Sequence, residues 1–184
     1  LGATPEMMMS WRLGPQGTPT YTVYWHKGLN GGTYNQNYGI YMGYSLGNYS
    51  VSTWWNQTSA TSTQFTVGSS DHVNKSGDEY SMVLFKSLAG FQKVGYYIGN
   101  GSAGNVINTG FTTGSRFVMI KRTDSTGSWR QYDTKRGLSS SVSMNCNAND
   151  YTAQSDDDFL RQHNTGFELN TSDGEVNASG GNYI

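Results

Sequence analysis

The stretch FVMIKRTDSTGSWRQYDTKRG, residues 117–137, decides how this chain folds. Its first four residues are apolar strand formers, turn residues follow at 123–128, and Trp129 and Tyr132 lie on a returning segment. A strand, a polar turn and a second strand predict a β-hairpin. We expect Trp129 and Tyr132 to anchor this hairpin in the core. Its polar residues are assigned to the turn and the surface: Lys121, Arg122, Asp124 and Thr126.

A degraded copy of this hairpin opens the chain. Residues 7–12 align with residues 117–122, and after a Pro/Gly-rich loop Tyr24 aligns with Tyr132. Further along, Phe65 aligns with Phe167. Two octapeptides then match: VNKSGDEY ends at Tyr80, and VNASGGNY ends at Tyr183. Because the order is preserved and only the loops change length, we predict two repeat units.

The predicted boundaries are residues 1–86 for the first repeat and 87–184 for the second. The first repeat lacks a counterpart of the segment 91–100, and the second stops just after Tyr183, inside its last strand. We therefore expect either that the natural chain continues at both ends or that neighbouring chains supply the missing strands.

Composition indicates an all-β protein. Tyr is abundant, with 13 residues, and 24 Gly accompany many Ser, Thr and Asn, which are strand and turn formers. No segment keeps a helical apolar spacing over three turns, so little or no helix is expected. A repeat of roughly 100 residues suits an antiparallel β-sandwich of the jelly-roll or lectin-like kind. Beyond the hairpin, strands are expected at residues 7–12, 21–26, 38–44, 50–55, 64–67, 80–86 and 91–98.

Charge and cysteine content exclude several classes of protein. Charged residues make up 14% of the chain and the net charge is −1, which argues against a nucleic-acid binder. The single cysteine, Cys146, permits no internal disulfide bond. No apolar run is long enough to span a bilayer, so membrane insertion is not expected.

The sequence offers no catalytic motif. His26, His72 and His163 are scattered and lack the neighbours of a catalytic triad or a zinc site. The acidic run Asp156-Asp157-Asp158 could supply oxygen ligands to Ca²⁺, but a solvated acidic loop fits it better. We therefore expect no enzymatic activity, no metal and no cofactor.

Aromatic side chains are the best candidates for binding. Several gather between residues 34 and 55, and ring faces can stack on sugars. The alternative is that they fill the core or a subunit interface, since alternate residues of a strand face opposite sides. The candidate sugar-stacking residues are Tyr41, Tyr44, Trp54 and Trp55.

Three segments together resemble the repeated β domains in structural proteins of marine tailed bacteriophages. They are GNGS at 99–102, FVMIKRTDSTGSWRQYD at 117–133, and FTVG with VNKSGDEY within 65–80. The first repeat departs from the pattern, because SWR and an enlarged loop replace the lysine and the Asp-Ser-Thr turn. The resemblance implies a virion component from a tail fibre or the head surface, but no residue roles.

These observations lead to one expected function and two alternatives. We expect a structural, non-enzymatic component of the virion exterior, located on the virion surface or extracellularly. Its expected partners are other copies of itself, other virion proteins and, in one reading, a host-surface glycan. The alternatives are a carbohydrate-binding adhesin module and a subunit of an extracellular filament. A glycan hydrolase would require a carboxylate pair, which the sequence does not indicate.

Overall fold

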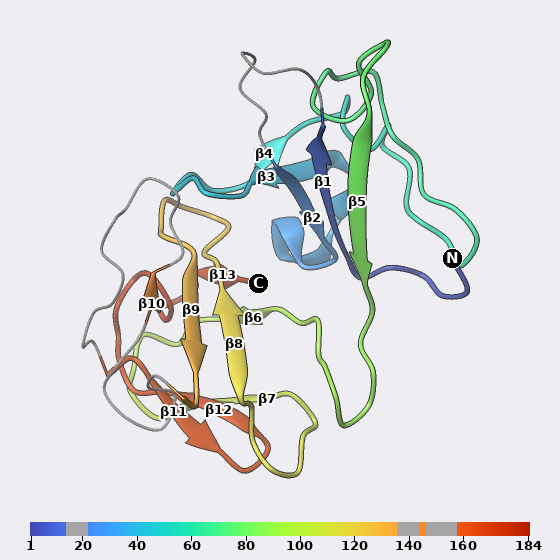
Figure 1. The fold of residues 1–184 in the computed structure, drawn as a ribbon. Coiled ribbons are helices and arrows are strands. Elements are labelled where there is room, and N and C mark those ends of the chain that lie inside the picture. Colours follow the sequence, from blue (N-terminus) through green and yellow to red (C-terminus); the bar gives the residue numbers. More distant parts are fainter. Residues whose placement is uncertain (14–21, 136–143, 146–157) are drawn as a thin grey trace. The chain divides into compact units, whose positions relative to one another are not determined.

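The fold is described from a computed structural model, in which residues 1–13, 22–135, 144–145 and 158–184 are placed (Figure 1). These residues form antiparallel strands and two short 3-10 segments, Leu29–Gly32 and Asn35–Asn37. The prediction of an all-β chain with little helix is therefore confirmed. Tyr21, most of the Pro/Gly-rich loop before it and Cys146 lie outside the described residues.

The chain divides into two compact units. Unit 1 comprises Leu1–Met42 and Asn48–Ser87, and unit 2 comprises Gly43–Gly47 and Leu88–Ile184. The segment Gly43–Gly47 leaves unit 1 after β3 and returns before β4. A short piece of the first half of the sequence is thus built into the second unit.

Unit 1 contains a five-stranded antiparallel sheet with the order β4-β3-β2-β1-β5. Its strands are β1 (Met7–Arg12), β2 (Val23–His26), β3 (Tyr38–Tyr41), β4 (Tyr49–Ser50) and β5 (Tyr80–Phe85). Figure 1 shows β5 lying along β1, to which all six of its residues are paired. Within the described part of unit 1, β5 is the edge of this sheet.

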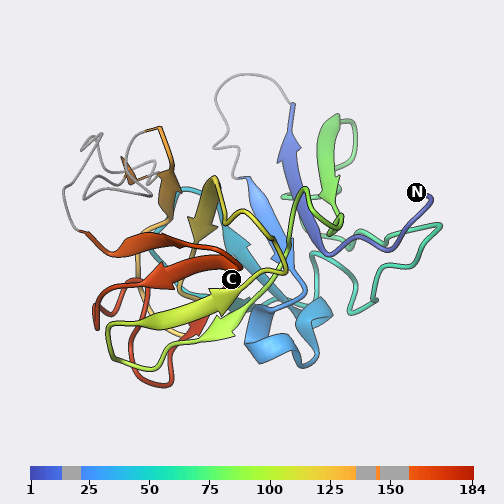
Figure 2. The ribbon, with the colours of Figure 1, turned by 90° about the horizontal axis from the view of Figure 1, so that it is seen from below.

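Unit 2 contains three small antiparallel sheets. Their orders are β10-β9-β8, β11-β12-β7 and β13-β6, and Figure 2 shows β7, β12 and β11 side by side in yellow-green and red. The strands are β6 (Tyr97–Ile98), β7 (Asn105–Asn108), β8 (Phe117–Ile120), β9 (Arg130–Asp133), β10 (Met144–Asn145), β11 (Leu160–His163), β12 (Gly166–Leu169) and β13 (Asn182–Tyr183).

The core of unit 2 joins these sheets. Val118 and Ile120 of β8 and Tyr132 of β9 pack with the inward residues of β11, β12 and β13. Trp129 and Tyr132 are 1% and 3% exposed, which confirms both as core anchors of the hairpin. Alternation along β8 places Val118 and Ile120 inside while Phe117 faces solvent.

The strand register corrects one detail of the repeat alignment. Met8 pairs with Trp25 in unit 1, and Val118 pairs with Tyr132 in unit 2. Since Met8 aligns with Val118, the counterpart of Tyr132 is Trp25, and the alignment of Tyr24 with Tyr132 is wrong by one residue. A one-residue shift of this kind exchanges the two faces of a strand, so the register decides it.

Both units contain a loop closed by a tyrosine hydroxyl. The hydroxyl of Tyr80 accepts a hydrogen bond from the amide of Lys75 at 2.8 Å, and the hydroxyl of Tyr183 accepts one from the amide of Ala178 at 2.7 Å. Each hydroxyl also donates to the carbonyl oxygen nine residues upstream, at 2.6 and 2.8 Å respectively. The two octapeptides found in the sequence therefore form the same local structure.

An asparagine side chain holds the start of each of these loops. The Nδ2 of Asn74 donates to the carbonyl oxygen of Gly68 at 3.0 Å, and that of Asn177 donates to the carbonyl oxygen of Thr171 at 2.7 Å. Both acceptors lie six residues upstream. A side-chain amide can cross-link a loop in this way because it replaces a backbone partner.

Several expected strands are shorter or missing, including the one expected at 38–44, of which only Tyr38–Tyr41 is a strand. Within 50–55 only Ser50 belongs to a strand, and within 91–98 only Tyr97–Ile98 does, because a turn closed by Leu88 and Gln92 precedes it. Residues 64–67 form no strand. In unit 2 the corresponding β12 pairs with β7, a strand for which the described part of unit 1 has no counterpart.

Candidate functional site

Tyr41, at the end of β3, is the centre of an aromatic cluster in unit 1. Its ring makes edge-to-face contacts with Trp54, Tyr49 and His72, at centroid distances of 4.9, 5.5 and 5.3 Å. Its hydroxyl lies 3.1 Å from Nε2 of His72. Trp54 also contacts the ring of His72 edge to face, at 5.7 Å. These four rings form the aromatic cluster.

A glycine in β3 makes room for the tryptophan of the aromatic cluster. A Cβ atom at Gly39 would lie 2.2 Å from Cε3 of Trp54, so the indole packs directly on the strand backbone. Gly39 stays within the regular β3 ladder, paired with Tyr49. A glycine inside a strand often marks such a close approach.

Only part of the aromatic cluster faces solvent. Tyr41, Tyr49 and His72 are half-buried, whereas Trp54 is 3% exposed. Trp55 is 1% exposed. Stacking on a sugar requires an open ring face, so neither tryptophan can carry the sugar-stacking role assigned to it in the folded unit.

The fourth predicted residue, Tyr44, belongs to the other unit. It is half-buried and lies in the segment Gly43–Gly47, which belongs to unit 2. The structure therefore brings together two of the four candidates, Tyr41 and Trp54. It adds Tyr49 and His72, which the sequence reading did not select.

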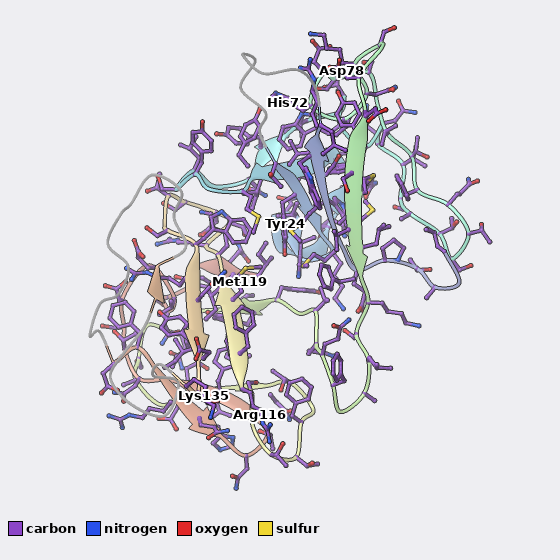
Figure 3. All side chains as sticks on the ribbon, viewed as in Figure 1. Tyr24, His72, Asp78, Arg116, Met119 and Lys135 are labelled. Carbon is purple, nitrogen blue, oxygen red and sulfur yellow. The ribbon has the colours of Figure 1, made fainter. Side chains whose placement is uncertain are left out.

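The chemistry of the aromatic cluster is that of a neutral hydrogen-bonding surface. Burial lowers the pKa of His72 from its ordinary value, and the nearby Asp71 opposes that change. The imidazole is accordingly neutral at pH 7 and can exchange a hydrogen bond with the hydroxyl of Tyr41. A phenol and a neutral imidazole suit polar, uncharged ligands. Figure 3 labels His72 and, in the same loop, Asp78, which pairs with Arg12.

Lys121 is a second feature of interest, and its predicted position is wrong. It was assigned to the turn and the surface, but its exposed fraction is 0%. Its Nζ donates to the carbonyl oxygens of Ser45, Arg122 and Gly127 at 3.1, 2.9 and 2.7 Å. Burial lowers the pKa of Lys121 to about 8, partly offset by the charge of Glu175.

The role of Lys121 is to fasten the segment Gly43–Gly47 to the hairpin of unit 2. The same segment accepts a hydrogen bond at the carbonyl of Ser45 from the amide of Gly127 at 2.7 Å. A Cβ at Gly47 would lie 2.8 Å from the carbonyl oxygen of Thr123, so only glycine fits there. Three carbonyl acceptors use all three ammonium protons, which makes Lys121 a structural cross-link.

His26 and the carboxylates of Glu6 and Glu175 have structural partners. His26 is buried, accepts a hydrogen bond from the amide of Gly28 at 2.9 Å, and has its pKa lowered to about 3 by burial. Glu6 binds Lys27 at 2.5 Å, and Glu175 binds Arg130 at 2.5 Å. None of these contacts is a pair of carboxylates.

Metal binding finds no support in the described residues, which contain no group of three His, Cys, Asp or Glu side chains placed to hold an ion. Of the acidic run, Asp156 and Asp157 lie outside these residues. Asp158 pairs with Arg161 at 2.9 Å and accepts a hydrogen bond from Asn170 at 3.0 Å. None of the described helical segments is long and apolar enough to cross a bilayer.

The sequence contained signals for two of the residues that were not predicted, His72 and Tyr49, but not for the burial of Lys121. His72 directly precedes the repeated octapeptide at Val73, and Tyr49 flanks Ser50, which begins an expected strand. The burial of Lys121 had no local signal, because one of its acceptors, Ser45, is 76 residues away in sequence.

The sequence was compared with protein families, curated proteins and solved structures. Residues 1–184 match the family described as a domain of unknown function, DUF7483. No curated protein and no solved structure matches the chain. Because the match covers the whole sequence, the chain belongs to the family of the domain of unknown function DUF7483.

Proposed function

We propose that this chain is a non-enzymatic structural component of a phage virion exterior, in a tail fibre or on the head surface. It assembles through its β-strands with other copies of itself and with other virion proteins. Each unit acts in this proposal as one β-sandwich repeat. The resemblance of residues 117–133 and 65–80 to phage structural domains supports the virion setting.

The free edge of β5 carries this proposal. All six residues of Tyr80–Phe85 are half-buried, and the strand pairs only with β1 in the described part of unit 1. An open edge of this length offers unpaired amide and carbonyl groups to another chain. In contrast, two of the predicted sugar-stacking residues, Trp54 and Trp55, are buried.

Self-association tests the proposal. Sedimentation velocity of the purified chain over a range of concentrations should reveal oligomers. Met82→Lys places a charge on the free edge and should shift them toward monomer, since edge lysines block strand pairing. Thr112→Lys, at an exposed position of unit 2, adds the same charge and should change nothing. A chain that stays monomeric at every concentration, and that captures no other virion protein, would overturn the proposal.

A carbohydrate-binding adhesin is the second candidate, and the half-buried Tyr41 and Tyr49 favour it. A glycan panel at millimolar concentration tests this function. Binding that is lost in Tyr49→Ala but kept in Tyr96→Ala, an exposed tyrosine of unit 2, would support the adhesin. Failure of every glycan would remove it. The extracellular filament subunit would also self-associate, and an image of the native particle separates it from a virion part.

A further inference from the structure

The two tyrosine-closed loops lead into strands that have different neighbours. In unit 2, β13 pairs with β6, with Tyr183 opposite Tyr97, and Tyr183 also bridges to Arg122 after β8. In unit 1, the corresponding Tyr80 pairs with Arg12 alone. The position that β6 occupies in unit 2 is thus an open edge in the described part of unit 1.

The loop asparagines of the two units also differ in their burial and hydrogen bonds. Asn177 is fully buried, and its Oδ1 accepts hydrogen bonds from the amide of Asn100 and from Nδ2 of Asn105, both at 3.0 Å. Its Nδ2 donates to the carbonyl oxygen of Ser102 at 2.9 Å. Its counterpart Asn74 is exposed, although it makes the same bond to its own loop.

The tyrosine rings differ in the same way. Tyr97 of β6 stacks on Tyr183 at a centroid distance of 5.0 Å, and its hydroxyl donates to the carbonyl oxygen of Val176 at 2.7 Å. Tyr183 is 1% exposed as a result. The equivalent residue, Tyr80, is half-buried, so it is more accessible than Tyr183.

The apolar residues before each loop show what β7 covers. Phe167 and Leu169 of β12, which pairs with β7, are 5% and 0% exposed. The corresponding Phe65 and Val67 are half-buried. The segment 97–108, which contains β6 and β7, therefore covers one side of the core in unit 2, whereas the matching residues of unit 1 are only half-buried.

We propose that unit 1 binds, in trans, a strand–loop–strand segment with the chemistry of residues 97–108, carried by a neighbouring polypeptide of the same family. The segment adds to the edge of β5, stacks an aromatic ring on Tyr80, and places a Gly-Asn-Gly turn over Asn74. This inference deepens the proposed function, on which it rests, because it names the surface and the partner through which the chain assembles.

The segment has features that unit 1 can recognise specifically. The amide of Gly99 donates to the carbonyl oxygen of Gly181 at 2.9 Å, and a Cβ at Gly99 would lie 2.3 Å from the carbonyl oxygen of Ala178. The counterparts of these acceptors in unit 1 are the carbonyls of Asp78 and Lys75. Main-chain pairing provides affinity in this mode of recognition, and the close glycine contact provides selectivity.

A synthetic peptide of residues 93–110 provides the test. We expect it to bind the purified chain, measured by titration calorimetry, and to slow hydrogen exchange at the amide of Tyr80. Asn74→Ala removes two side-chain acceptor contacts and should weaken binding by about 10-fold or more. Glu79→Gln, at the exposed neighbour of Tyr80, is the matched control and should bind normally.

Peptide variants test the recognition from the other side. Gly99→Ala in the peptide should abolish binding, whereas Gly95→Ala should not, because a Cβ at Gly95 meets nothing closer than 3.8 Å. Absence of binding at millimolar peptide would overturn the inference. So would equal binding by Asn74→Ala, or a Tyr80 amide already protected in the chain alone, which would mean that something else covers the edge.

Sedimentation of the peptide-free chain separates this inference from the proposed function. If the chain assembles but the peptide neither binds nor perturbs the assembly, the docking surface is wrong and the structural role stands. If the peptide binds through Asn74 but the chain joins no assembly, the docking surface stands and the structural role fails.

Discussion

The ammonium nitrogen of Lys121 lies 2.7 Å from the carbonyl oxygen of Gly127, across the turn of the hairpin in unit 2. The side chain is fully buried, and its other two hydrogen bonds reach Arg122 and Ser45. A cation in this position serves neither a substrate nor a surface. It donates hydrogen bonds to three carbonyl groups, one of which, that of Ser45, also accepts from the amide of Gly127.

Replacing this lysine should therefore destabilise unit 2. We expect Lys121→Met to fill the space of the side chain but to remove the hydrogen bonds that its Nζ donates to three carbonyl oxygens, at a cost of about 2–4 kcal/mol. Urea unfolding followed by tryptophan fluorescence measures the change. Lys93→Met removes an exposed lysine of the same unit and should have almost no effect. Equal stability of the two variants would contradict the cross-linking role.

The carboxylate of Glu6 should make unit 1 sensitive to acid. Burial raises the pKa of Glu6, but hydrogen bonds from Lys27 and Ser87 outweigh it and hold the pKa at about 2, below the ordinary 4.5. As the pH falls from 4.5 to 2, the unfolded chain therefore binds a proton that the folded chain does not. Stability present above pH 4.5 is lost over this range.

The matching variant is Glu6→Gln. It should be less stable than the natural chain at pH 7, by about 1–2 kcal/mol, since the carboxylate is partly exposed and solvent weakens the ion pair. Its stability should also change less between pH 4.5 and 2. Thermal melts across this range, with Glu79→Gln as an exposed control, measure both effects. An unchanged acid profile in Glu6→Gln would show that another group is responsible.

Packing of Trp54 on β3 should depend on Gly39. Gly39→Ala introduces a Cβ 2.2 Å from the indole, which forces the ring or the strand to move. We expect a loss of about 3 kcal/mol or more in unit 1, together with a change in near-ultraviolet circular dichroism. Gly95→Ala, where the nearest atom is 3.8 Å away, serves as the control. A native-like spectrum and stability for Gly39→Ala would refute this packing.

The two loop asparagines, Asn177 and Asn74, should contribute unequally to the free energy of unfolding. Asn177→Ala removes several hydrogen bonds of a fully buried side chain, including those with Asn100 and Ser102, and should cost about 3 kcal/mol or more. Asn74→Ala affects an exposed side chain with the same loop bond and should cost about 1 kcal/mol. Unfolding of both variants under identical conditions gives the comparison. Equal costs would mean that residues 97–108 do not account for the burial of Asn177.

Much of the local structure could be predicted from the sequence. Met7–Arg12 and Phe117–Ile120 were expected as strands, because apolar strand formers are followed by turn residues. The repeated octapeptides ending at Tyr80 and Tyr183 were recognised as equivalent from their matching residues. In the structure, each tyrosine hydroxyl accepts the same hydrogen bond from an amide five residues upstream. The position of Trp25 opposite Met8 was missed by one residue, because a loop of changed length hides the register.

The candidate site was only partly predictable. Tyr41 was selected, but His72, its hydrogen-bond partner, lies 31 residues away and belongs to a loop whose path the sequence does not give. Trp54 was a candidate for sugar stacking, with a position in the core as the alternative, and its packing on Gly39 buries it. Aromatic residues suit both positions equally well, so composition does not separate a core from a binding surface.

The sequence by itself determined the all-β class, the hairpin and the repeated tyrosine-closed loop, because alternation, turn residues and short-range hydrogen bonds are local properties. Only the tertiary structure decided that Lys121 is interior, that Gly43–Gly47 belongs to unit 2, and that β5 is an edge strand in the described part of unit 1. Each of these depends on groups far apart in the chain. Packing and the hydrogen bonding of buried polar groups bring these residues together, and no local sequence pattern encodes such contacts.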